Sequence, residues 1–166
     1  MEEWLIVDGY NVIGAHTDWS ALPLEEARRQ LASLLSEYKA VTGRKVMLVF
    51  DAHRSPGAEN REMASGITVW FTREHETADQ LIERLVRQHK KPGRHIYVAT
   101  SDYLEQRMVF GQGAYRLSAR ELIRDLSTMK GNIAQRIREA ERERYTLGQG
   151  LKGELLEALE KWRRKK

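Results

Sequence analysis

The chain has 166 residues, of which 41% are hydrophobic and 31% charged, with a formal net charge of +4 and no cysteine. This composition is typical of one soluble globular domain with at most an appendage, and the absence of cysteine excludes disulfides and thiolate zinc sites. No apolar stretch approaches the roughly 20 residues that a membrane span requires, so we expect a cytoplasmic protein with no membrane contact.

Short apolar runs alternate with helical patterns along the chain, as they do in βα units. Near-continuous apolar runs indicate strands that are buried on both faces, which is typical of parallel sheets. The predicted strands cover residues 4–7, 46–50, 67–71 and 95–99, with a shorter fifth strand over 114–117. The sequence therefore predicts an α/β fold with a mainly parallel sheet of about five strands.

Two helices between these strands are marked by apolar residues at helical spacing. The first follows Pro23 and ends at Gly43, a residue type that is common just past a helix C-terminus. The second begins near Thr77 and ends before Pro92. Residues 52–66 show no sustained period, which predicts a long loop.

The C-terminal part of the chain carries the whole basic excess. Residues 1–129 contain 17 Lys and Arg against 18 Asp and Glu, whereas residues 130–166 contain 11 against 6. Further helices are predicted from about residues 103 and 119, and two amphipathic helices after Gly131 with a break at 147–150. We expect a body over 1–129 and a basic helical extension over 130–166. The extension either contacts a polyanion such as RNA or a ribosomal surface, or only solubilises the chain.

Aspartates follow three of the predicted strands. Asp8, Asp51 and Asp102 each stand at the end of an apolar run or shortly after it. Because the carboxyl ends of parallel strands lie along one edge of a sheet, we expect these three side chains to converge. A single Asp in such a place more often forms a turn or caps a helix, and that alternative stays open for each of them.

Asp79 adds a fourth acid from the first turn of the second predicted helix. Either the helix dipole favours Asp79 and the neighbouring Glu76, or Asp79 leans over the strand ends and completes a cation site. Carboxylates without cysteine or paired histidine suit Mg²⁺ or Mn²⁺, which can activate water for phosphodiester hydrolysis. Asn11 could orient Asp8 or the substrate, and Ser101 could hold a metal-bound water or a phosphate oxygen. The alternative for each is an ordinary turn hydrogen bond.

Other phosphate chemistries lack their motifs. The sequence contains no P-loop pattern, and its close glycine pair at 111 and 113 lacks a third glycine. Tyr10 stands where an aspartyl phosphatase would carry its second Asp. Nucleotide triphosphatases and phosphatases of that kind are therefore excluded.

Four short segments carry a family resemblance. They are Val7-Asp8-Gly9-Tyr10-Asn11-Val12-Ile13, Val49-Phe50-Asp51-Ala52, Glu76-Thr77-Ala78-Asp79 and Thr100-Ser101-Asp102. Together they resemble the NYN branch of the PIN-like nucleases, and specifically the YacP-like proteins. The resemblance covers roughly residues 3–129 and, for the YacP-like group, extends to the C-terminal helices.

The resemblance implies a three-layer, PIN-like (NYN) fold and a divalent-metal-dependent endoribonuclease that leaves 5′-phosphate and 3′-hydroxyl ends. By position, Asp8, Asp79 and Asp102 look like the acidic core. Asp51 looks like either a further metal ligand or an acid just behind the ligands, and Asn11 and Ser101 look like supporting residues. YacP-like proteins include ribosome-associated endonucleases that cut messenger RNA, so mRNA and the ribosome are the implied partners. Some PIN-like sites carry another acid where this chain has Ser118, which leaves the number of metal ions open.

Aromatic and basic residues near these acids are candidates for RNA contact. Tyr10 and Tyr103 would stack on bases, whereas Trp70 is expected in the core. The candidate phosphate contacts are His53, Arg54 and Arg61 in the long loop and Arg136, Arg138 and Arg142 in the basic extension. A second hypothesis is a catalytically weak RNA-binding or ribosome-docking module. A DNA nuclease would use the same acids.

Overall fold

The computed structural model describes residues 2–54, 61–64, 66–101 and 113–164. The chain divides into two compact units, Met1–Ser127 and Thr128–Lys166. The assignment of a nuclease domain to residues 1–129 and of a basic extension to 130–166 stays a prediction. None of the described helices combines the length and the apolar character required to cross a bilayer.

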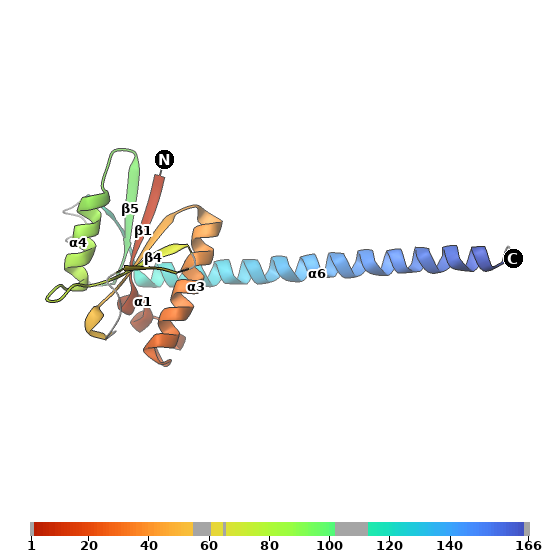
Figure 1. The fold of residues 1–166 in the computed structure, drawn as a ribbon, viewed down its shortest axis with the longest axis horizontal. Coiled ribbons are helices and arrows are strands. Elements are labelled where there is room, and N and C mark those ends of the chain that lie inside the picture. Colours follow the sequence, from red (N-terminus) through yellow and green to blue (C-terminus); the bar gives the residue numbers. More distant parts are fainter. Residues whose placement is uncertain (1, 55–60, 65, 102–112, 165–166) are drawn as a thin grey trace. The chain divides into compact units, whose positions relative to one another are not determined.

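The first unit is built on one six-stranded sheet with the strand order β3-β4-β2-β1-β5-β6. Its parallel strands are β1 (Glu2–Asp8), β2 (Lys45–Phe50), β4 (Ile67–Phe71), β5 (Arg94–Ala99) and β6 (Tyr115–Leu117). β3 (Arg61–Ala64) pairs antiparallel with β4 at one edge. The predicted α/β fold, with a mainly parallel sheet of about five strands flanked by helices, is confirmed (Figure 1).

Helices cover both faces of this sheet (Figure 1). α1 (Gly9–Ala15) and α2 (Thr17–Ser20) follow β1, α3 (Leu24–Thr42) leads to β2, and α4 (Ala78–His89) connects β4 to β5. The predicted ends of α3 and α4 are confirmed, because Gly43 closes α3 with a φ of 74° and Thr77 caps α4. α1 and α2 have seven and four residues, too few to show a helical period in the sequence.

Strand alternation gives each face of the sheet its own core. The cluster beneath α4 combines alternate strand residues with the apolar side of that helix. Its buried members are Trp4, Ile6, Met47, Val49, Leu81, Ile82, Leu85, Val86, Ile96, Val98 and Ala114. Because successive strand side chains point to opposite faces, Leu5 and Val7 belong to the other face, where α3 supplies the fully buried Leu31 and Leu35. Each such side chain stabilises the fold by about 1.5–3 kcal/mol.

The prediction of one long loop over residues 52–66 is wrong. This range contains a 3₁₀ turn, η1 (Ala52–Arg54), and the strand β3. β3 has four residues, and its Glu-Met-Ala sequence has little β-propensity. The strand therefore forms because it pairs with β4, and the local sequence alone does not predict it. Ala64 pairs with Ile67 in this antiparallel ladder, and Gly66, just before β4, adopts a φ of 87°.

The prediction of two separate C-terminal helices is also wrong. α6 (Ala119–Arg164) is one helix of 46 residues and continues through the expected break at 147–150. An internal glycine costs about 1 kcal/mol relative to alanine, and the surrounding Glu, Arg, Lys and Leu residues offset that cost because they favour helix. The start of this helix at Ala119 is as predicted. The helix predicted from residue 103 lies outside the described residues.

Candidate active site

The strand order reverses between β1 and β5, and this reversal defines the candidate site. β2 pairs with one side of β1, whereas β5, which comes later in the chain, pairs with the other side. In open α/β sheets, ligands bind in the crevice outside the carboxyl ends of the strands at such a reversal. Asp8 is the last residue of β1 and therefore stands at this point.

Asp8 is a buried carboxylate, with 9% of its surface exposed. It continues the alternation of Trp4 and Ile6, so its side chain belongs to the side of the sheet that α4 covers. Asp8 pairs in register with Val49 of β2, and Asp51 follows two residues later. The sheet therefore brings Asp8 and Asp51 to one edge on adjacent strands, and the convergence of their side chains stays a prediction. A carboxylate in such a buried place needs hydrogen-bond donors or cations around it.

Asp51 also forms a turn, which was the alternative reading for it. Its Oδ1 accepts a hydrogen bond of 2.9 Å from the N–H of His53 at the start of η1. Beside it, the N–H of Ala52 donates to Oγ1 of Thr72 at 2.9 Å, and the N–H of Thr72 donates to the carbonyl of Phe50 at 3.1 Å. The ends of β2 and β4 are thus tied together. Turn formation does not exclude a cation, because an ionised carboxylate has about four acceptor sites.

Asn11 joins the ends of β1 and β5. Its Oδ1 accepts a hydrogen bond of 2.7 Å from the N–H of Ser101. Oγ of Ser101 in turn accepts from the N–H of Ala119 at 3.3 Å, at the start of α6. Asn11 and Ser101 therefore make hydrogen bonds that join elements far apart in the sequence, and these bonds fix the position of Ser101. Asp102 itself lies outside the described residues.

Asp79 lies in the first turn of α4, where the helix dipole favours a negative charge. The helix start is fixed by a capping box. Oγ1 of Thr77 accepts from the N–H of Gln80 at 3.2 Å, and Oε1 of Gln80 accepts from the N–H of Thr77 at 3.0 Å. Because α4 follows β4, this first turn and Asp79 belong to the same carboxyl edge as Asp8 and Asp51.

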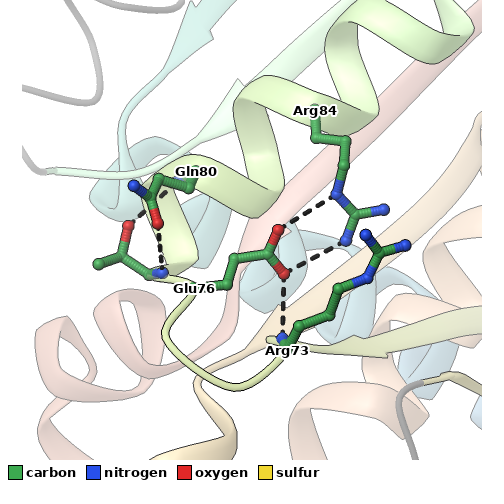
Figure 2. Close-up of polar contacts among 5 residues, drawn as sticks. Arg73, Glu76, Gln80 and Arg84 are labelled. Carbon is green, nitrogen blue, oxygen red and sulfur yellow. Dashed lines mark hydrogen bonds and ion pairs between the residues drawn. The ribbon is translucent and has the colours of Figure 1, made fainter.

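Glu76 is held by specific partners rather than by the helix dipole alone (Figure 2). Arg84 donates two hydrogen bonds of 3.2 Å to its carboxylate, and the N–H of Arg73 donates a third at 3.0 Å. Burial raises the pKa of Glu76, but the bonds from Arg84 and from the Arg73 backbone outweigh that effect, so its pKa lies below the ordinary value. Glu76 therefore stabilises the loop that presents Asp79.

Within the part of the chain that the structure describes, no three His, Asp or Glu side chains stand close enough together to hold a metal ion. The strand order places Asp8, Asp51 and Asp79 on one edge of the sheet, but the described side chains do not form a metal-binding cluster. The fourth acid, Asp102, lies outside the described residues. The potential metal ligands at this edge are carboxylate, hydroxyl and amide oxygens, which are ligand types that Mg²⁺ and Mn²⁺ prefer. Ser118, the position at which the resemblance implies another acid in some PIN-like sites, caps α6 through a 3.1 Å bond from the N–H of Glu121.

The candidate RNA contacts are only partly described. Tyr10 is half-buried and its ring centroid lies 4.9 Å from that of Phe50, whereas His53 is exposed. Trp70 packs against the core cluster beneath α4, as expected. In the second unit the exposed residues of α6 include Arg136, Arg138 and Arg142. The side chains that lie outside the description are Arg54, Arg61 and Tyr103.

Two cations that the sequence analysis missed stand at the same edge. The guanidinium of Arg28 in α3 lies 5.8 Å from the ring centroid of Phe50, the last residue of β2. Arg73 follows the end of β4 by two residues, and its side chain is exposed. The position of Arg73 just after an apolar run was a usable signal. Arg28 gave none, because it is one of many charged residues on a surface helix.

Comparison with known proteins agrees with this fold. A family model described as the YacP-like NYN domain matches residues 5–164. YacP of Bacillus subtilis strain 168 is 45% identical over an alignment of 163 residues, and the match covers 96% of this chain and 96% of that protein. The crystal structure of Rae1 (YacP) from Bacillus subtilis has a TM-score of 0.77 and 44% identity, and the similarity covers 97% of this chain and 94% of that chain. A tryptophan-to-leucine mutant of Rae1 gives a TM-score of 0.75 at 44% identity over 86% of both chains. The chain therefore belongs to the nuclease-like family of YacP-like NYN domains.

Proposed function

We propose that this chain is a divalent-metal-dependent endoribonuclease that hydrolyses messenger RNA in association with the ribosome. The observation that carries the proposal is the place of Asp8, a carboxylate 9% exposed at the reversal of strand order. Family membership supports nuclease chemistry at this edge. The YacP-like resemblance supports the ribosome as partner.

The acids of this edge have the roles of metal ligands in the proposal. The residues that would hold Mg²⁺ or Mn²⁺ are Asp8, Asp51, Asp79 and Asp102. When bound, such an ion supplies charge neutralisation of the phosphate and activation of water for in-line attack. Asn11 has a positioning role, because its bond to the N–H of Ser101 fixes the chain just before Asp102.

Cationic and aromatic side chains would hold the RNA around these acids. Arg28 and Arg73 place positive charge at the edge where the scissile phosphate would lie, which offsets the repulsion between phosphate and carboxylates. The half-buried ring of Tyr10 would stack on a base of the RNA. The exposed Arg136, Arg138 and Arg142 of α6 would contact more distant phosphates.

The test is cleavage of a labelled messenger RNA, free and in translating ribosomes, with Mn²⁺ or with EDTA. We compare the wild type with Asp8→Asn and with Asp18→Asn, a matched change at an exposed aspartate of α2. We expect metal-dependent cutting on ribosomes by the wild type and Asp18→Asn, and none by Asp8→Asn, which should still fold.

Three outcomes would contradict parts of this proposal. Full activity of purified Asp8→Asn would remove Asp8 from the site. Equal cutting of free and ribosome-bound RNA would remove the ribosome from the proposal. RNA binding without cutting in any condition would favour an RNA-binding or ribosome-docking module.

A further inference from the structure

A cavity of about 470 Å³ lies at the opposite edge of the sheet from the carboxylates. Its walls come from the end of α4, the connection to β5 and the segment just before β6. β5 and β6 begin here, at Arg94 and Tyr115, so this is the amino edge of the parallel sheet. The volume falls within the roughly 300–1,000 Å³ that is typical of small-molecule sites.

Three cationic residues line this cavity, namely Lys90, Lys91 and Arg94, and its described lining includes no Asp or Glu. Glu2 pairs with two of these cations, because its Oε2 lies 3.1 Å from Nε of Arg94 and 4.0 Å from Nζ of Lys91. Glu2 is not among the lining residues, so the described lining carries three positive charges and no negative one. The cavity therefore favours an anionic ligand.

Arg94 forms a fixed wall of the cavity. Its guanidinium carbon lies 3.9 Å from the ring centroid of Trp4, and the same guanidinium donates hydrogen bonds to Glu2 and to the carbonyl of His89. Only 12% of the Arg94 side chain is exposed. The presence of a cation at position 94 is explained by the helix end, because Arg94 donates to the last carbonyl of α4 and neutralises the negative end of the helix dipole. The helix end does not explain the cation at position 91, because the Lys91 side chain is 58% exposed.

Lys90 reaches across the cavity from the end of α4 to the segment before β6. A Cβ placed on Gly113 would lie 2.8 Å from Nζ of Lys90, so the ammonium group lies directly against this glycine. Gly113 also has a φ of 80°, which favours glycine at this position. The lack of a side chain at residue 113 leaves room for the Lys90 ammonium at the cavity wall.

The remaining lining is mostly apolar. Val86 and Ile96 are buried members of the core cluster beneath α4, and Pro92 adds a rigid apolar ring at the turn into β5. An apolar floor with ammonium groups above it suits a ligand that joins a phosphate to an apolar, flat group.

We propose that this cavity binds a nucleoside phosphate through Lys90, Lys91 and Arg94. The ligand is either a free mononucleotide or the terminal phosphate and nucleoside of an RNA strand, because both present the same chemistry. Anion binding stands on the cavity alone, whereas the choice of a nucleoside rests on the proposed function.

The test is calorimetric titration of the full chain with adenosine and uridine 5′-monophosphates and with inorganic phosphate, in EDTA. The variant is Lys90→Gln with Lys91→Gln, and the matched control is Arg29→Gln with Lys130→Gln, which removes two exposed cations elsewhere. Both are checked for an unchanged melting temperature. We expect saturable binding of a mononucleotide that weakens about ten-fold or more in the variant and stays unchanged in the control. Asp8→Asn should bind like the wild type, which separates this cavity from the carboxylate edge.

Competition then separates the two sources of the ligand. Displacement by an oligoribonucleotide with a 5′-phosphate, but not by one with a 5′-hydroxyl, supports an RNA terminus; no displacement by either supports a free nucleotide. No saturable binding at millimolar concentrations, or equal binding by wild type and variant, would overturn the proposal. Inorganic phosphate binding as tightly as the mononucleotides would overturn its nucleoside part. None of these readouts depends on RNA cleavage, so a failure of the proposed nuclease activity stays distinguishable.

Discussion

Oδ1 of Asn11 lies 2.7 Å from the backbone nitrogen of Ser101 and links the first helix of the chain to the end of β5, across 90 residues of sequence. The two residues come together because β5 pairs directly with β1. This bond holds Ser101 close to the end of β1, at the reversal of strand order. Asn11 therefore serves both the fold and the candidate site.

We expect Asn11→Ala to lower the free energy of unfolding by about 1 kcal/mol, because it removes the acceptor of the Ser101 N–H. It should also reduce RNA cleavage by more than this loss of folded protein explains. Asn11→Asp keeps an acceptor oxygen and should retain the stability, which chemical denaturation would measure. Equal stability of Asn11→Ala and the wild type would show that this bond does not hold the two strand ends.

Gly9 is required for close packing at the start of α1. A Cβ at this position would lie 2.2 Å from Cε1 of Phe50, a ring that also contacts Tyr10. Gly9→Ala should destabilise the protein by about 1–3 kcal/mol, because the Phe50 ring must move in a filled core. The matched control is Gly14→Ala, where a Cβ meets nothing within 4 Å and where alanine should stabilise α1 by about 0.4–1 kcal/mol. Thermal unfolding measures both, and equal melting temperatures of the two variants would contradict the packing argument.

The strands and main helices of this fold could be predicted because they carry local signals. β1, β2, β4 and β5 are continuous apolar runs, and Gly43 and Thr77 mark helix ends. β3 and α2 lacked such signals, since each has four residues. The continuity of α6 could not be predicted from its glycines, because their cost is small beside the propensity of the residues around them.

The candidate site shows the same division between local and long-range information. Asp8 and Asp51 follow apolar runs, so their common edge follows from the rule for parallel strands. The contact between Asn11 and Ser101 depends on β5 lying beside β1. No local sequence pattern predicts this strand order, so the contact could not be predicted either. Glu76 and Arg84 are eight residues apart, and Glu76 lies in the loop before α4. The rules for i,i+3 and i,i+4 pairs on a helix therefore could not predict their bond.

Glu76 should make stability depend on pH in the acid range. Its pKa is lowered in the folded protein, so its contribution is fully present above the ordinary value of 4.5 and is lost as the pH falls through the lowered folded value. The side chains of Glu76 and Arg84 are 14% and 17% exposed. Glu76→Gln should therefore cost about 1–3 kcal/mol near neutral pH.

The difference in unfolding free energy between the wild type and Glu76→Gln should shrink as the pH falls below 4.5. Urea unfolding at several pH values measures it. Glu74→Gln is the control, because Glu74 is 88% exposed in the same loop and should change little at any pH. A difference for Glu76→Gln that stays constant down to pH 2 would show that the charge of Glu76 does not stabilise the loop.

His16 caps the short helix α2 through its ring. Nδ1 of His16 accepts hydrogen bonds from the N–H groups of Asp18 at 3.1 Å and Trp19 at 3.3 Å, so the ring proton must sit on Nε2. The same ring stacks on the buried Trp19, with centroids 4.0 Å apart and planes at 18°. His16→Ala loses both interactions and should cost about 1–2 kcal/mol, whereas His16→Asn keeps a cap acceptor and should recover about half of that loss. Thermal unfolding would measure the two variants. If His16→Asn were no more stable than His16→Ala, the ring stack rather than the cap would be the stabilising contact. If neither variant changed the melting temperature, α2 would contribute nothing to the stability of the unit.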